Sequence, residues 1–396
     1  MAPPLIRQDT IGETMLNGFP LTDASQGAIT CWLLDTRNLW PGDNIYTAGD
    51  AAACLAHIPM PEQNVVTTKM FIQDARMSLG SALLKRSYIS KTLGIPWQDV
   101  RIARKGNGKH GKPCAVDANG KPIEGIDFNV SHQAGLVALI GWDRRKHSTS
   151  FASGPFANAT TVHDRGEEKN VTVGVDIVCV NERDDYRTID EDGLDGWVEL
   201  YESIFSHEER WSMKFDIDYA TMLDGTVLEH HDLGRLDRCI ARDKNVRATT
   251  REGETVDFNS DRLIEAKLRR FYTYFCYKES YIKLAGEGLL APWLCELSFH
   301  NVRSPRAGTP ARCSTLGTWG EQVDDVEVQL YGEPVKDVKM KIQAFEEDVM
   351  ISTAIRGSVD GVVVPGFKKL DLYKDVLSGA DGDIKSFKGG VSASRT

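Results

Sequence analysis

The feature that most constrains the fold is a helical pattern over residues 261–285, which ends at Gly286 and Gly288. With each residue turning the helix by about 100°, its apolar side chains fall within about 40° of one direction. This stripe consists of Leu268, Phe271, Phe275 and Ile282. A helix with such a stripe buries it against another layer, and the closing glycines favour a helix terminus over a coiled coil.

A charged pair, Glu279 and Lys283, lies beside this stripe. Glu279 falls about 40° and Lys283 about 80° from the direction of the stripe, so the acid is on the core-facing side and the lysine on its rim. One interpretation is an exposed i,i+4 ion pair that adds a few tenths of a kcal/mol to helix stability. The position of the pair on the helix favours a second interpretation, in which Glu279 contacts a cation. A carboxylate on the buried side costs several kcal/mol unless a cation meets it.

A second acid, Asp176, lies in a strand pattern over residues 171–178. Alternation along this strand places Val171, Val173, Val175 and Ile177 on one face, and it places Asp176 with Thr172, Gly174 and Val178 on the less apolar face. Asp176 either makes a bond at the end of the strand or meets a ligand. Two carboxylates and phosphate oxygens make a typical magnesium site, because magnesium takes few protein ligands and keeps several waters.

The rest of the chain mixes helices and strands without a regular βαβ order, which predicts an α+β fold. Two more helices are expected, at residues 69–93 and 199–213, the first ending before Pro96. Further strands are expected at residues 28–40, 126–132, 136–142, 294–300, 326–332, 338–345 and 349–355. The strands at 126–132 and 136–142 are separated by a short turn with a glycine, so they are expected to form a hairpin.

Three segments have the composition of loops or tails. Residues 143–170 are polar and predict an inserted loop or linker, and residues 214–260 are charged with little periodicity, which predicts an insertion. Residues 382–396 are expected to be disordered.

Charge and composition exclude several classes of protein. The formal net charge of −10 argues against nucleic-acid binding. The apolar runs are too short for a membrane span, and no secretion signal is evident, so we expect a cytoplasmic protein without a membrane partner. The eight cysteines form no CxxC, so we expect them to be reduced. One basic cluster stands out, and it is either a solvated loop or an anion site: Arg101, Arg104, Lys105, Lys109 and Lys112.

Five segments occur in an order that resembles the Sfp-type 4′-phosphopantetheinyl transferases of the fungal, broad-specificity kind. They are IPWQDVRIARKGNGKHGKP, FNVSHQ, VGVDIV, FSHEER and YKESYIKLAGEGL, which begin at residues 95, 128, 173, 205 and 277. The resemblance implies a magnesium-dependent enzyme that moves the phosphopantetheine arm of coenzyme A onto a serine of acyl or peptidyl carrier domains. Adenosine 3′,5′-bisphosphate is then released, and the apo carrier becomes holo carrier.

The resemblance also implies an architecture. The family has two similar α+β halves related by a pseudo-twofold axis, with coenzyme A in the cleft between them. For this chain it implies an N-terminal half at 1–142, a linker at 143–170, a C-terminal half at 171–360 with its insertion at 214–260, and a tail at 361–396. We expect a monomer.

Residue roles follow from the same resemblance. Asp176 and Glu279 resemble the metal-binding carboxylates, for Mg²⁺ or Mn²⁺, and Lys283 resembles the catalytic lysine. His132 is expected to contact a phosphate and to take part in catalysis. The expected coenzyme-binding residues are Arg104, Gly111, Lys112, Pro113, Asn129, Val130, Ser131 and His132. The proton of the carrier serine goes either to Glu279 or to a water on the metal.

The sequence departs from the family pattern in three places. Val178 stands where many bacterial members have another acid, so water is expected to fill that coordination position. The loop 105–110 is longer than in many relatives, which leaves Arg104 a weaker candidate than Lys112. Some relatives use basic residues further upstream for the 3′-phosphate of coenzyme A. No residue of this sequence matches them clearly, and Lys69 and Arg86 are the nearest candidates.

Alternative functions predict other sequence features. A coenzyme A-binding protein without turnover would lack Asp176, Glu279 or Lys283, and all three are present. A zinc or nucleotide hydrolase would need a metal-spaced histidine cluster or a GxxxxGK[ST] loop, which the glycines near residue 106 do not form. The carriers served are not evident, and the candidates are those of fatty acid, polyketide, nonribosomal peptide and lysine biosynthesis.

Overall fold

The structure of this protein is a computed structural model. It describes residues 28–105, 111–147, 171–180, 184–288, 291–308, 316–357 and 362–380. Among these residues, no helix is both long and apolar enough to cross a bilayer. Most of the predicted linker at 143–170, the loop 106–110 and the predicted disordered end at 382–396 lie outside the described residues.

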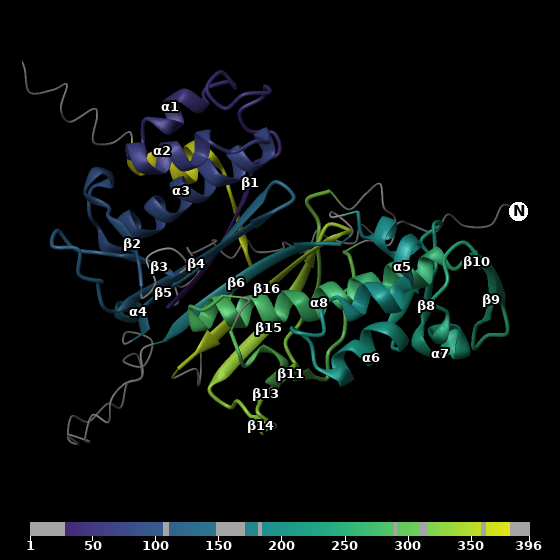
Figure 1. Ribbon diagram of the computed structural model, residues 1–396. Helices are drawn as coiled ribbons and strands as arrows, with labels where there is room; N and C mark the ends of the chain where they lie inside the picture. The colour runs from purple at the N-terminus through teal and green to yellow at the C-terminus, as the bar shows by residue number, and fades with distance from the viewer. Residues whose placement is uncertain are drawn as a thin grey trace, which may run out of the picture.

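Two four-stranded sheets organise the molecule (Figure 1). One has the order β17 (Lys368–Leu370), β1 (Ile29–Asp35), β5 (Leu136–Asp143) and β4 (Ile126–Gln133). The other has the order β12 (Trp319–Val323), β15 (Val338–Phe345), β16 (Val349–Arg356) and β6 (Thr172–Cys179). The expected hairpin between residues 126 and 142 is confirmed, with β4 antiparallel to β5. Mixed helices and sheets confirm the α+β prediction.

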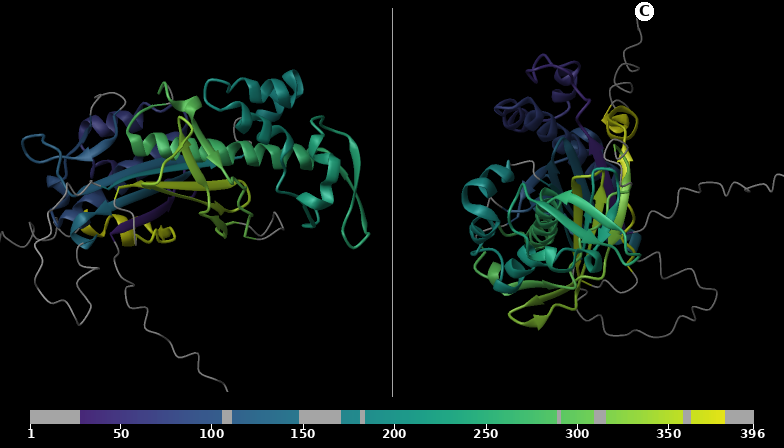
Figure 2. Two further views of the ribbon diagram at one scale, coloured as in Figure 1. Left: turned by 90° about the horizontal axis from the view of Figure 1, so that it is seen from below. Right: turned by 90° about the vertical axis from the view of Figure 1, so that its right-hand side faces the viewer.

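Each sheet carries one long helix on its outer face, and the two inner faces pack together. Helix α3 (Ile72–Leu93) covers the first sheet, and α8 (Asp261–Ala285) lies along the second (Figures 1 and 2). Alternation along the strands produces this layering. Val175 of β6 and Ile140 of β5 share the core between the sheets, whereas Val178 faces α8.

Helix α8 has the predicted bounds, but more of its surface is buried than the single apolar stripe that the sequence predicted. Polar side chains such as Lys267 and Lys278 are buried as well as the apolar ones. The helix is enclosed on several sides because the segment 214–260, the helices before it and the strands after it all pack against it. It ends at Gly286, whose φ of 77° is favourable for glycine.

The prediction of one helix over 199–213 was wrong. Helix α5 (Asp185–Glu199) ends where that helix was expected to begin, and α6 (His207–Phe215) starts after a turn. Ser206 explains the new start, because its side chain and that of Glu209 form a capping box. The spacing of residues 199–213 had predicted one continuous helix across this turn.

The remaining elements are short. Residues 51–147 also contain α1 (Ala51–Leu55), α2 (Met60–Thr67), η1 (Trp97–Asp99), β2 (Ile102–Arg104), β3 (Pro113–Ala115) and α4 (Arg144–His147). The segment 214–260 contains β7 (Tyr219–Thr221), β8 (Val227–Glu229), α7 (His230–Leu233), η2 (Gly234–Arg238), β9 (Asn245–Thr249) and β10 (Thr255–Asn259). After α8 come η3 (Leu294–Glu296), β11 (Leu297–His300), β13 (Glu327–Leu330) and β14 (Glu333–Pro334).

The described part of the C-terminal segment returns to the first sheet. Strand β17 pairs in parallel with β1, and η5 (Leu372–Val376) follows it. Val376 and Leu377 are buried in the core beneath α3. The chain therefore joins the two sheets twice, once before β6 and once after β16.

Candidate active site

The site begins at a seam where the edge strands of the two sheets meet. Asp127, Asn129 and Ser131 alternate along β4 and point toward β6. Their side chains accept the backbone N–H groups of Val173, Val175 and Ile177 at 2.9, 3.0 and 3.3 Å. The free edge of β6 is thus paired with side chains instead of another strand, which removes the cost of unpaired buried N–H groups.

Asp176 lies on the other face of β6, toward α8. Its carboxylate is buried, and Ser131 Oγ donates a hydrogen bond to Oδ1 at 2.8 Å. Lys283 reaches the same group from α8, with Nζ 2.5 Å from Asp176 Oδ1 and 3.0 Å from Ser131 Oγ. Side chains from β4, β6 and α8 therefore meet at one point.

Gly174 allows this approach of helix to strand. A Cβ at this position would lie 2.1 Å from the carbonyl oxygen of Ser280 and 2.6 Å from the backbone nitrogen of Leu284. Both atoms are backbone and cannot rotate away. The glycine two residues before Asp176 is thus needed for α8 to bring Glu279 and Lys283 beside the strand.

A pocket of about 360 Å³ opens at this point. Most of the predicted site residues line it, namely Arg104, Gly111, Lys112, Pro113, Asn129, Val130, Glu279 and Lys283. Ile282 and the helix-end residues 286–288 complete the lining. Asp176 and Ser131 are outside this lining, and both bond to Lys283, which belongs to it. The pocket brings together residues from 104 to 288 in the chain.

The charges in the site affect one another strongly. Burial by itself lowers the pKa of Lys283, but the carboxylates of Asp176 and Glu279 outweigh it and raise that pKa above its usual value. Loss of water contact and the positive charges of Lys283 and Lys69 lower the pKa of His132 to about 4. His132 is therefore neutral at pH 7, and it is an exposed residue outside the pocket lining.

Lys112 is held in the seam. Its ammonium pairs with Asp127 and donates to the carbonyl of Val173 at 2.6 Å. Burial lowers the pKa of Lys112, against the opposing effect of Asp127. An ammonium has three donors, so these two bonds leave one N–H for a ligand in the pocket.

The candidate bases for the 3′-phosphate have different surroundings. Arg86 is buried, donates to the carbonyl of Val100 at 3.0 Å and pairs with Glu62 at 2.5 Å. It is absent from the pocket lining, so the structure does not bring it to the site. Lys69 is exposed and near enough to His132 to influence its charge.

A buried ion pair supports α8 from behind, and sequence reasoning missed it. Lys278 Nζ lies 2.9 Å from Glu209 Oε2, with both side chains almost fully buried. Lys278 also donates to the carbonyls of Leu294 and Leu297, at 2.9 and 2.5 Å. The segments FSHEER and YKES are joined by this pair, so their joint occurrence in the sequence was the available signal.

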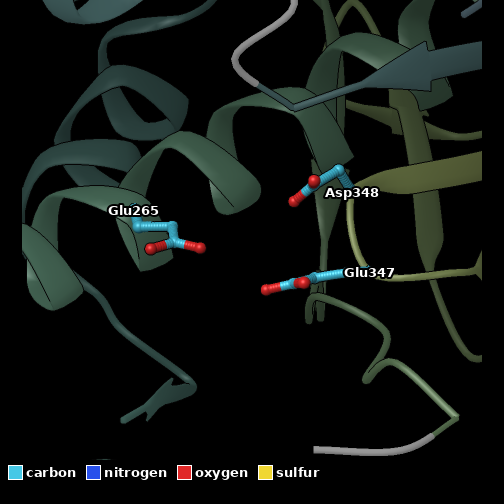
Figure 3. Close-up of side chains that lie close together, drawn as sticks. All are labelled: Glu265, Glu347 and Asp348. Atoms are coloured by element: carbon cyan, nitrogen blue, oxygen red, sulfur yellow. The ribbon is translucent and has the colours of Figure 1, made fainter. Parts of the chain in front are cut away.

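A second acidic group lies elsewhere on α8. Glu265 faces Glu347 and Asp348, which follow β15, and their carboxylate oxygens lie within 4.8 Å of one another (Figure 3). Arg262 pairs with Glu265 at 2.5 Å, and Arg269 and Arg306 line the same pocket. Glu265 is about 21 Å along the helix from Glu279, so the two sites are distinct. The positive charges of the arginines offset the negative charges of the three acids, and we assign no function to this group.

Comparisons with known proteins support the site. The family model for the N-terminal domain of 4′-phosphopantetheinyl transferases matches residues 47–143. A 4′-phosphopantetheinyl transferase of Aureobasidium melanogenum is 56% identical over 359 residues, which cover 90% of this chain and 99% of the relative. 4′-Phosphopantetheinyl transferase A of Aspergillus fumigatus is 33% identical, covering 84% of each chain. The transferase NpgA of Emericella nidulans is 30% identical, covering 89% of this chain and 94% of the relative.

The fold, the pocket and these similarities define the class of this protein as an α+β transferase. The sequence identity with these relatives, and the share of each chain that is matched, also show its family. The chain belongs to the 4′-phosphopantetheinyl transferase family, as its five ordered sequence segments predicted, and the three relatives named above are fungal.

Proposed function

We propose that this protein transfers the 4′-phosphopantetheine arm of coenzyme A to a serine of acyl and peptidyl carrier domains. The observation that carries the proposal is that Lys283 contacts Asp176 and is influenced by Glu279, beside a pocket that Glu279 and Lys283 line together with Arg104 and Lys112. Cytoplasmic carriers of fatty acid, polyketide, nonribosomal peptide and lysine biosynthesis are the proposed substrates, and the enzyme works as a monomer.

The reaction is a phosphoryl-type transfer. The serine Oγ attacks the phosphorus next to the pantetheine, a new P–O bond forms, and the bond to the other phosphate of the diphosphate breaks. Adenosine 3′,5′-bisphosphate leaves, and the serine proton passes to a base. Such reactions gain most from positioning and from charges aimed at the reacting phosphate.

The residues of the pocket fit these needs. Arg104 and Lys112 are the proposed contacts of the coenzyme phosphates, with Gly111, Pro113, Asn129 and Val130 shaping the turn and strand that hold it. His132, which follows Ser131 outside the lining, is a further proposed phosphate contact. Lys283 remains protonated at neutral pH because of its neighbouring acids, so its charge is available to the transferring group. The proposed acceptor of the serine proton is Glu279 or a water molecule held beside it.

The acids also fit a divalent cation. Asp176 and Glu279 offer hard carboxylate oxygens from two elements, the donor type that Mg²⁺ and Mn²⁺ prefer. When bound, such an ion would neutralise the diphosphate and favour loss of the bisphosphate. Ser131 orients Asp176 through its hydrogen bond, so the carboxylate is held in place beforehand.

We also propose that the two sheet-and-helix units are related by a pseudo-twofold axis, with one half at 1–142 and the other at 171–360. Each long helix covers one four-stranded sheet, which supports this proposal, although the first sheet takes its strand β17 from the segment 361–396. The seam between β4 and β6 would then lie near the axis. Coenzyme A would bind beside it.

A mass measurement tests the function. The protein is mixed with an apo carrier domain, coenzyme A and magnesium, and the carrier is expected to gain about 340 Da, the mass of the transferred arm. A carrier with serine replaced by alanine is the control and gains nothing. An unchanged mass on every apo carrier tested, with folded enzyme, would refute transfer.

A further inference from the structure

Exposed apolar side chains gather where α2 leads into α3. Four of them lie within residues 60–71 and are more than half exposed, namely Met60, Val65, Met70 and Phe71. We call these four residues the α2–α3 patch. Met70 is 88% exposed and Phe71 62%, although both immediately precede the buried helix α3. Grouped apolar side chains on a surface usually mark an interaction site.

The patch lies beside the candidate active site. Phe71 is the N-cap residue of α3, whose second turn contacts the turn after β4 through a bond from Gly135 N–H to Met77 Sδ at 3.2 Å. His132 lies three residues before Gly135. Lys69 and Asp74, which flank Met70 and Phe71, both act electrostatically on His132. The patch is therefore at the side of the site where a partner could present a serine.

The charge around the patch is not acidic. Within residues 60–76, the bases are Lys69 and Arg76 and the acids are Glu62 and Asp74, so the charges balance, and Glu62 is paired with Arg86. Lys85 adds positive charge near His132. An acidic partner would meet apolar side chains beside Lys69, on a surface without net negative charge.

A second pair of exposed apolar residues has the opposite surroundings. Leu200 and Trp211, on the α5–α6 segment, are 64% and 56% exposed. The residues 184–215 that carry them include ten acids and three bases, and two of those bases pair with Glu199. An acidic partner would be repelled there, so charge distinguishes the two surfaces.

We propose that the α2–α3 patch is the docking surface for the carrier domain, whose acidic and partly apolar helix would contact Met70 and Phe71 while its serine enters the pocket past His132. This inference rests on the proposed function and adds the surface that the carrier uses. The arrangement accounts for two large apolar side chains left in water at the edge of the site.

The test compares a double variant, M70S/F71S, with the control L200S. Serine is a favoured N-cap residue, so F71S preserves the start of α3, and thermal melts check the fold. Initial rates are measured against the concentration of an acidic apo acyl carrier domain at saturating coenzyme A and magnesium. The double variant is expected to raise the KM for the carrier about tenfold, while kcat and the KM for coenzyme A stay within about twofold of wild type.

The control and the salt dependence complete the test. L200S is expected to leave the carrier KM unchanged, and added salt is expected to raise the wild-type carrier KM more than the KM for coenzyme A. An unchanged carrier KM in M70S/F71S, or a raised one in L200S, overturns the docking surface while the transfer function stands. If the wild-type enzyme modifies no carrier, the transfer function is overturned. The carrier domain is then also overturned as the partner of the α2–α3 patch.

Discussion

Lys283 Nζ lies 2.5 Å from Asp176 Oδ1, although the two residues are 107 positions apart in the chain. The contact joins α8 to the edge strand of the second sheet, and Ser131 from the first sheet bonds to both partners. At this contact the two sheets meet beside the charged pocket.

Replacing Lys283 should affect turnover more than binding. We expect K283M to lower kcat at least about 100-fold, because a preorganised charge facing the transferring group is lost, with a smaller change in the KM for coenzyme A. K283R should recover part of the activity. Steady-state kinetics with an apo carrier measure both, and a K283M enzyme with near wild-type kcat would contradict the role.

Gly174 should not tolerate a side chain. In G174A the new Cβ would press on the backbone of Ser280 and Leu284, so α8 must move away from β6. We expect a loss of about 1–3 kcal/mol in the free energy of unfolding and a large loss of kcat. The control is G366A, where a Cβ would meet nothing within 4 Å. Urea denaturation and carrier modification give the two readouts, and equal behaviour of both variants would contradict the close approach.

The buried pair of Lys278 and Glu209 should be costly to break from one side. K278M leaves Glu209 buried without its cation, and E209Q leaves the lysine without its anion, so each is expected to cost about 3–5 kcal/mol. The double variant K278M/E209Q should cost less than the sum of the two single ones. Chemical denaturation of the four proteins measures this coupling, and additive losses would show that the pair does not act as a unit.

Lys267 provides a pH dependence away from the pocket. Its buried ammonium donates to the carbonyls of Asp237 and Cys239, and burial lowers its pKa to about 8. Unfolding restores an ordinary pKa of 10.5, so between about pH 8 and 10.5 the unfolded state binds more protons than the folded state. Stability relative to K267M should therefore rise with pH across this window. Thermal melts at pH 7 to 10 test it, and a wild-type advantage that falls over that range would contradict the lowered pKa.

The sequence predicted the elements with strong periodicity. Strands β4, β5, β6, β15 and β16 and helices α3 and α8 appear within a few residues of their expected bounds. The site residues came from the ordered segments, and the structure places most of them around one pocket. Both successes rest on signals that lie within short stretches of chain.

What the sequence did not reveal depends on contacts between distant segments. The bonds from Asp127, Asn129 and Ser131 to the backbone of β6 leave no periodic pattern, because only one partner is a side chain. The break between α5 and α6 depends on a local capping box that helical spacing does not reveal. Pairing of β17 with β1 joins residues more than 300 apart, which no local pattern predicts.

The most direct test of the account is Mn²⁺ binding followed by electron paramagnetic resonance in the presence of coenzyme A, with EDTA-treated protein as the starting point. We expect one site in the wild type that is lost or strongly weakened in both D176N and E279Q and retained in E265Q, whose side chain belongs to the separate acidic group. Mn²⁺ binding that survives D176N and E279Q, or that disappears in E265Q, would contradict the claim that Asp176 and Glu279 share one metal ion.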